Sequence, residues 1–244
     1  SFDMPFADIF TIQDKVSKQL VNQLRLKLAP AEQARLIKRY TTNAEAYAYY
    51  AKSMYHFSKR GFSGVPPDET LSSIDLLKRA IELDPNYALA RAQLGFAYAW
   101  KAEYHKSGPE YIAMAKEELR LAEQLEPQLA EVHLARSFIA WSHFGNWQTE
   151  EALREALLAK ELGVSIPNIM LASLYFHIGL EEQGAKEFEQ ALEQDPGSDI
   201  LKLNYPGQLK NAARPDDWLA LSQRLVGGGP NSPYYLLKMM PAEA

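Results

Sequence analysis

The side chains that most often hold metal ions or act as acid–base catalysts are few in this sequence and widely spaced. The chain contains no cysteine, which excludes disulfides, thiolate metal ligands and cysteine nucleophiles. Its histidines form no His-Glu-x-x-His motif and no other tight ligand spacing; they are His56, His105, His133, His143 and His177. We therefore expect no metal and no cofactor, and a structural or solvent-exposed role for each imidazole.

Two other patterns have residue types that could bind phosphate or supply catalytic carboxylates. Glycines 227–229 have the composition of a phosphate-binding loop, but no predicted strand precedes them and no Gly-Lys-Ser/Thr follows, which favours a helix terminator. Paired carboxylates stand near the starts of predicted helices, where negative charge suits the helix dipole: Glu150 with Glu151, Glu181 with Glu182, and Asp216 with Asp217. Because neither pattern forms a catalytic constellation, the sequence predicts a protein that is not an enzyme.

The composition indicates a folded chain whose partner is neither nucleic acid nor the bilayer interior. Hydrophobic residues make up 47% of the 244 residues and charged residues 23%, which is enough apolar surface for a core. The formal net charge of −5 disfavours nucleic acid as a partner. No apolar run approaches the ~20 residues that span a bilayer. The first residue is not methionine, so we interpret the chain as a fragment of a longer protein.

Four similar phrases recur along the chain and predict a repeat architecture. In each, an alanine is followed five positions later by a residue that ends a helix, usually proline; the phrases are residues 80–85, 122–127, 159–164 and 191–196. Three positions before each alanine, on the same helical face, lie Leu77, Leu119, Ala156 and Phe188. Alanine lets two helices approach closely, its neighbour on the face fills the adjoining space, and proline ends the helix.

Another apolar helix completes each pair. In the clearest unit, Leu171, Ala172 and Tyr175 lie at helical spacing, Gly179 makes the turn, and a second stripe begins at Gly184. From about residue 43 onward this pattern resembles the tetratricopeptide repeat, which alternates large and small residues on two helices within 34 residues. The resemblance implies an all-α fold, a right-handed solenoid of helix-turn-helix repeats, with an extra amino-terminal helix before it.

The repeat pattern predicts four clear helix pairs, at residues 44–58 with 70–83, 88–102 with 110–124, 130–143 with 150–162, and 168–178 with 181–194. Extra residues lie between the helices of the first two repeats, and Arg136 occupies a position that is usually apolar. A degraded fifth repeat is interrupted at residues 206–207, and a short helix at 232–240 caps the array or begins a sixth repeat. The predicted domains are therefore an amino-terminal segment, 1–42, and a repeat array, 43–244.

An apolar stripe marks a further helix within residues 8–40, formed by Ile9, Ile12, Val16, Leu20, Leu24 and Leu28. The phrase at residues 7–14, with 25–28 and 39–47, resembles a junction in large bacterial signalling proteins. In those winged-helix transcription regulators and membrane-anchored serine/threonine kinases, a small α/β domain precedes a tetratricopeptide array. The resemblance implies a soluble fragment, from the bacterial cytoplasm or from the extracytoplasmic part of a membrane-anchored regulator. Without that upstream domain the stripe needs a cover, which is the first repeat or, as we favour, the same helix in a homodimer.

Aromatic side chains mark the predicted binding surface. In arrays of this kind the first helix of each pair lines the concave groove, at positions just off the core stripe. Transferring that rule to this chain gives nine partner-binding residues: Lys52, Tyr55, His56, Phe96, Trp100, Phe138, Trp141, Phe176 and His177. A groove rich in rings suits an apolar or proline-containing polypeptide segment, because rings offer a large contact area at low entropy cost. The alternative is that several of these rings pack between neighbouring helices.

These features favour a protein–protein interaction scaffold, the docking or sensory module of a larger bacterial signalling or transcription-regulatory protein. A rigid array holds its binding surface in place, so the partner segment bears most of the ordering cost. Two other functions fit the same sequence. One is a receptor for a small molecule or short signalling peptide, and the other is an architectural spacer that dimerises.

Overall fold

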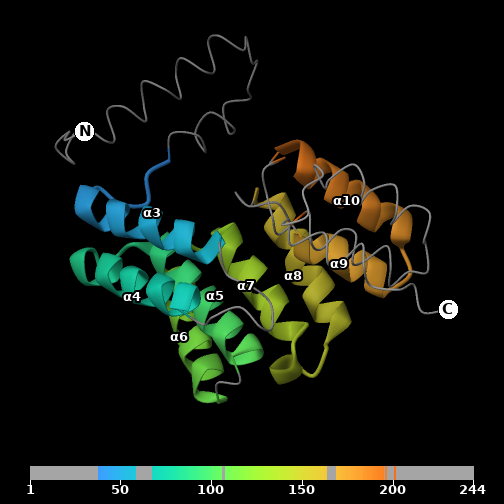
Figure 1. Cartoon of the computed structure of the whole chain (residues 1–244), viewed down its shortest axis with the longest axis horizontal. Helices are drawn as coiled ribbons and strands as arrows, with labels where there is room; N and C mark the ends of the chain where they lie inside the picture. Colours follow the sequence, from blue (N-terminus) through green and yellow to red (C-terminus); the bar gives the residue numbers. More distant parts are fainter. Residues whose placement is uncertain are drawn as a thin grey trace, which may run out of the picture. The chain divides into compact units, whose positions relative to one another are not determined.

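The computed structural model describes residues 38–58, 68–105, 108–163 and 169–194, together with Pro196 and Leu201. Within these residues the chain forms eight α-helices, one 3-10 helix and no strand, which confirms the predicted all-α class. The α-helices are α3 (Ala44–Ser58), α4 (Asp68–Leu83), α5 (Ala88–Tyr104), α6 (Glu110–Leu125), α7 (Ala130–Ala140), α8 (Thr149–Glu161), α9 (Ile169–His177) and α10 (Glu181–Gln194) (Figure 1). The chain divides into two compact units, with the boundary between Ala135 and Arg136 inside α7.

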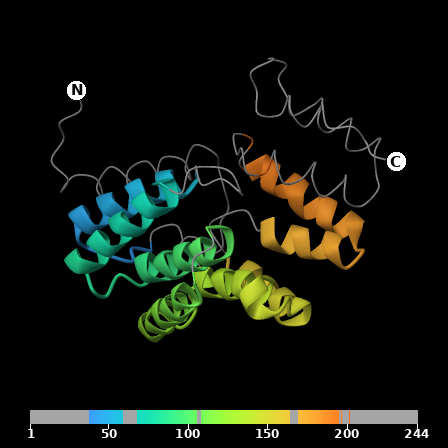
Figure 2. The same ribbon diagram turned by 60° about the horizontal axis from the view of Figure 1, so that its bottom comes forward.

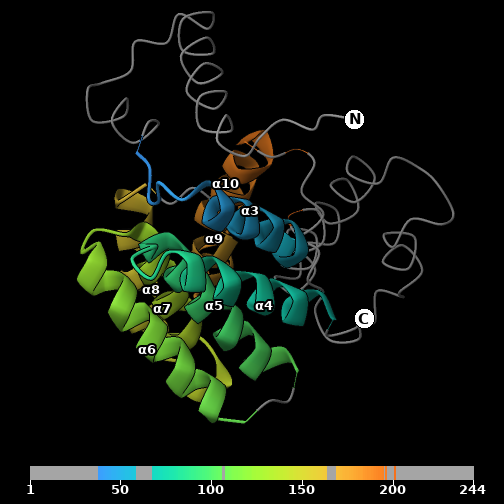
Figure 3. The same ribbon diagram turned by 90° about the vertical axis from the view of Figure 1, so that its left-hand side faces the viewer.

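The first unit is built from two successive helix pairs. Helix α3 packs on α4, α4 on α5, and α5 on α6 (Figures 1 and 3). The predicted core positions Leu77 and Ala80 of α4, and Leu119 and Ala122 of α6, are buried. Each of these second helices ends two residues before a proline, because a residue that precedes proline is disfavoured in the α-helical conformation. The two pairs thus follow the helix-turn-helix pattern of the predicted repeat.

Helices α5 and α6 cross closely at Gly95. A Cβ atom added at Gly95 would lie 2.8 Å from Leu119 Cγ and 3.0 Å from the backbone oxygen of Ala115. Ala115 is itself completely buried. A hydrogen atom at position 95 and a methyl group at position 115 therefore allow this short distance between the two helix backbones.

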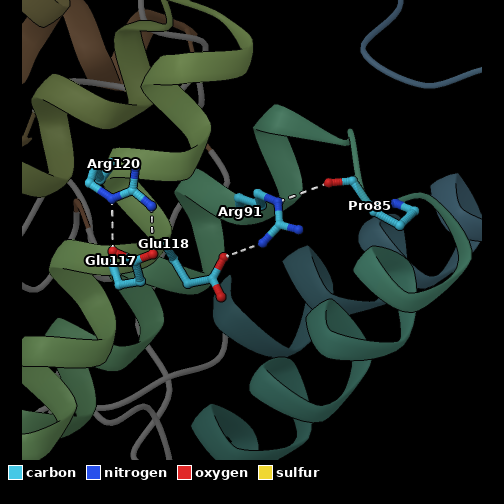
Figure 4. A network of polar contacts seen from close by, with 5 residues as sticks. All are labelled: Pro85, Arg91, Glu117, Glu118 and Arg120. Atoms are coloured by element: carbon cyan, nitrogen blue, oxygen red, sulfur yellow. Dashed lines mark hydrogen bonds and ion pairs between the residues drawn. The ribbon is translucent and has the colours of Figure 1, made fainter.

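A polar contact joins the α4–α5 turn to α6 (Figure 4). Arg91 Nη1 donates to Glu118 Oε2 at 2.8 Å, and Arg91 Nε donates to the backbone oxygen of Pro85 at 2.9 Å. The side chains of Arg91 and Glu118 are mostly buried, whereas the nearby Arg120–Glu117 pair within α6 is half exposed to solvent. Because exposed pairs contribute little to stability, the Arg91 contact is the more stabilising of these two pairs, and it links the turn to α6.

In the second unit, α9 packs against both α8 and α10 (Figure 2). Phe188 and Ala191 of α10 lie in one core cluster with Ala172 and Phe176 of α9, joined by Leu201. A separate cluster packs Ala140 of α7 and two alanines of α8 against two leucines of α9; these are Ala152, Ala156, Leu171 and Leu174. The predicted burial of Ala191 is confirmed.

The α7–α8 connection differs from its prediction. Helix α7 was predicted to reach residue 143, but it ends at Ala140, and a 3-10 helix (His143–Gly145) follows. The chain turns back on the helix end, so that the backbone NH of Gln148 donates to the Ala140 carbonyl at 2.9 Å. A Cβ atom at Gly145 would lie only 2.1 Å from the backbone oxygen of Ile139, so only glycine fits there. This fold-back uses the carbonyl groups of the helix end and stops α7 early.

Several predictions lie outside the described residues. They concern the amino-terminal helical stripe, most of the insertion at residues 59–70, the degraded fifth repeat and the carboxyl-terminal capping helix. The division into segments 1–42 and 43–244, and the homodimer through the amino-terminal helix, therefore stay predictions.

Candidate partner-binding surfaces

The nine predicted binding residues fall into two groups by exposure. Four of the rings are buried: Phe96, Trp100, Phe138 and Phe176. The other five side chains are exposed or half-buried: Lys52, Tyr55, His56, Trp141 and His177. In this conformation only the second group has side chains that solvent reaches, and the two groups include residues of both units.

A ring cluster explains the burial of the aromatic residues of α5. The Phe57 ring of α3 lies 5.4 Å from the Phe96 ring and 6.3 Å from the Trp100 ring, between centroids. The Trp100 ring also lies 4.3 Å from the Tyr104 ring, with the two ring planes tilted by 41°. Phe57 is only 1% exposed and was not among the predicted residues. Its edge contacts with two rings of the neighbouring first helix stabilise the α3–α5 packing.

The exposed residues of α3 form a small surface near its carboxyl end. Tyr55 is 57% exposed, and its ring meets the His56 ring edge-on at 5.5 Å. His56 Nδ1 in turn lies 2.6 Å from Glu69 Oε2 on α4. Lys52, one helical turn before His56, extends over the Tyr49 ring. The His56–Glu69 contact joins the two helices of the pair. It also fixes the His56 ring, against which the Tyr55 ring lies.

Burial shifts the pKa values of several side chains of the first unit, and His105 and Tyr98 are two of them. Burial lowers the pKa of His105, and the nearby Lys101 charge lowers it further. Burial also raises the pKa of Tyr98 to about 12, with a further contribution from Glu118. Lys101 itself lies 4.1 Å above the Tyr111 ring and donates to its hydroxyl at 2.8 Å. These shifts favour the neutral imidazole and the neutral phenol, which are the forms that burial disfavours least.

A second aromatic surface lies in the second unit. The Trp141 ring lies 5.4 Å from the His177 ring and 6.1 Å from the Trp147 ring, with both contacts edge-to-face. Trp147 is 53% exposed and was not predicted, because the concave-groove rule covers only the first helices and this residue lies in a turn. Its position in the sequence could have marked it as a candidate. A tryptophan in a polar turn does not belong to the apolar periodicity of a helix, so packing in a core does not explain it.

Neither a metal centre nor a membrane segment is found in the part of the chain that the structure describes. No three His, Asp or Glu side chains there are placed to hold a metal ion together. None of the described helices has both the length and the apolar character that crossing a membrane requires.

Comparisons with known proteins give partial similarities. No protein-family model matches the chain. A protein of Rhizobium meliloti (strain 1021) named "Putative adenylate cyclase 3" is 33% identical over 96 residues, which cover 38% of this chain and 15% of that protein. The chain thus aligns with only a small part of that relative. Among solved structures, that of YrrB, described as a TPR protein with an unusual peptide-binding site, has a TM-score of 0.45 and 15% identity, covering 95% of this chain and 98% of that chain.

Proposed function

We propose that the chain is a polypeptide-binding module, which serves as the docking or sensory part of a larger bacterial signalling or regulatory protein. The exposed Tyr55 side chain on α3 is the observation that carries the proposal. A tyrosine contributes a large, rigid contact area and a hydroxyl group, which makes it a frequent anchor in protein interfaces. The partial similarity to a longer protein with a signalling name supports the idea of a module within a larger chain.

Binding follows from pre-organisation in this proposal. Tyr55 rests on His56, and His56 is held by Glu69 from the neighbouring helix. The ring cluster around Phe57 lies within the same helix layer and gives α3 a rigid base. A partner segment that brings an apolar or proline side chain to Tyr55 therefore meets a surface that needs little ordering. Of the predicted residues in the first unit, Lys52, Tyr55 and His56 contact the segment, and the buried Phe96 and Trp100 rings support α3.

A peptide-display selection tests this function. The whole chain is immobilised, enriched peptides are sequenced, and their affinities are measured by fluorescence polarisation for the wild type and for Tyr55→Ala. Loss of an anchor of this kind costs about 2 kcal/mol, or roughly 30-fold in Kd. Leu71→Ala is the matched control, because Leu71 is an exposed apolar residue of α4 in the same unit.

The circular dichroism spectra of both variants should match that of the wild type, since both substitutions lie on the surface. Enrichment of one peptide motif whose binding depends on Tyr55 supports the proposal. If no motif is enriched, or if Tyr55→Ala and Leu71→Ala bind equally well, the surface near the end of α3 does not bind polypeptide.

A further inference from the structure

The second unit carries an exposed apolar surface that we name the tryptophan edge. It consists of two tryptophans from the α7–α8 connection and three residues at the α9–α10 turn: Trp141, Trp147, His177, Ile178 and Leu180. Trp147 is 53% exposed, and Ile178 and Leu180 are each about two-fifths exposed. The ring contacts of Trp141 with both His177 and Trp147 show that the two connections lie side by side.

This surface is costly for the stability of the fold. Asn146 and Trp147 both have positive φ angles, 54° and 55°; asparagine adopts this region readily, but a bulky residue such as tryptophan seldom does. The Trp141 Nε1–H is buried and has no hydrogen-bond acceptor within the described residues. Strained backbone and unsatisfied donors persist where a protein needs them for another purpose. Since the exposed Trp147 ring gains little from burial, the tryptophan edge is better explained by binding than by packing.

The charge around the edge selects the chemistry of the partner. Four glutamates directly follow it, Glu150 and Glu151 in the first turn of α8 and Glu181 and Glu182 in the first turn of α10. Residues 141–153 and 177–185 contain these carboxylates and no lysine or arginine. The first basic residue after Trp147 is Arg154, which pairs with Glu151. Glu150 and Glu182 remain exposed to solvent.

We infer that the tryptophan edge binds a basic polypeptide segment, in which arginine or lysine lies against the exposed tryptophan and apolar side chains cover Ile178 and Leu180. An aromatic face attracts a cation, and surrounding carboxylates strengthen that attraction and repel acidic segments. The inference rests on the proposed polypeptide-binding function and adds a second surface with a defined partner chemistry.

The test uses the whole chain and a labelled peptide with a repeating Arg-Leu-Gly sequence. A matched peptide has glutamate in place of each arginine. The arginine peptide should bind, with affinity that falls as salt is added, and the glutamate peptide should not. Trp147→Ala and Trp147→Gly should each weaken binding of the arginine peptide at least tenfold. Leu157→Ala is the control, because Leu157 is an exposed apolar residue of α8 outside the edge.

The glycine variant separates binding from folding. Glycine adopts a positive φ angle without strain, so Trp147→Gly should keep or raise the melting temperature while binding is lost. Equal binding of the two peptides, or unchanged binding by both Trp147 variants, would overturn the inference. So would a dimer that Trp147→Ala converts to monomers, since the edge would then be a contact between copies.

The experiment also distinguishes the two proposals. If displayed peptides bind through Tyr55 and the arginine peptide does not bind, the proposed function stands and the tryptophan edge has another role. If neither kind of peptide binds, both proposals fail.

Discussion

The crossing of α5 and α6 at Gly95 allows a sharp test of the packing. Substitution of Gly95 by alanine has two opposing effects on the free energy of unfolding. Alanine in the interior of a helix is favoured over glycine by about 1 kcal/mol. The added methyl carbon, however, would lie 2.8 Å and 2.9 Å from two carbons of Leu119 and 3.0 Å from the Ala115 oxygen.

The steric effect should be the larger one. Leu119 is almost fully buried, so its side chain has no open space to move into, and the Ala115 oxygen belongs to the helix backbone. Overpacking of such a site costs roughly 1–3 kcal/mol. After the gain in helix propensity is subtracted, Gly95→Ala should destabilise the protein by about 1 kcal/mol. The measurement is urea denaturation followed by far-ultraviolet circular dichroism.

A double-mutant cycle identifies the cause of the loss. In the Leu119→Ala background both carbon contacts disappear, and only the 3.0 Å contact with Ala115 remains. Gly95→Ala should then be neutral or should stabilise by up to about 1 kcal/mol, so the coupling between the two positions is of that order. If Gly95→Ala stabilises the protein in both backgrounds, the helices do not cross closely at Gly95 and the reasoning is refuted.

Two other predictions concern packing and pH. Ala191→Leu should overpack the α9–α10 core and lower stability by roughly 1–3 kcal/mol, whereas Ala113→Leu on the exposed face of α6 should change it by less than about 0.5 kcal/mol in urea denaturation. Equal midpoints for the two variants would contradict the repeat register. Because the pKa of His105 is lowered by folding, the unfolded chain binds the proton first as the pH falls below about 6.5, and stability decreases. The melting temperature of His105→Gln should therefore depend less on pH than that of the wild type between about pH 7 and pH 5. If both proteins show the same pH dependence, His105 does not cause the loss of stability.

Local sequence signals were sufficient to place the helices. The predicted limits of α3 and α10 agree with the structure, and those of the other second helices differ by at most two residues at either end. These elements depend on apolar periodicity and on prolines or glycines that stop a helix, and both act over a few residues. The small residues at close crossings were likewise recognisable, because Ala80, Ala122 and Ala191 recur at one place in each repeat.

The exposure of the candidate binding residues depended on contacts between helices. Spacing along α5 places Phe96 and Trp100 on one side of the helix, but their burial requires the Phe57 ring of α3. Trp147 shows the opposite outcome, exposure instead of burial. The turn that contains it folds back on α7 and leaves its ring exposed beside Trp141. Helix formation follows from neighbours along the chain. Side chains that are distant in sequence decide whether a ring is buried in the core or exposed on the surface. Only the tertiary structure brings those side chains together.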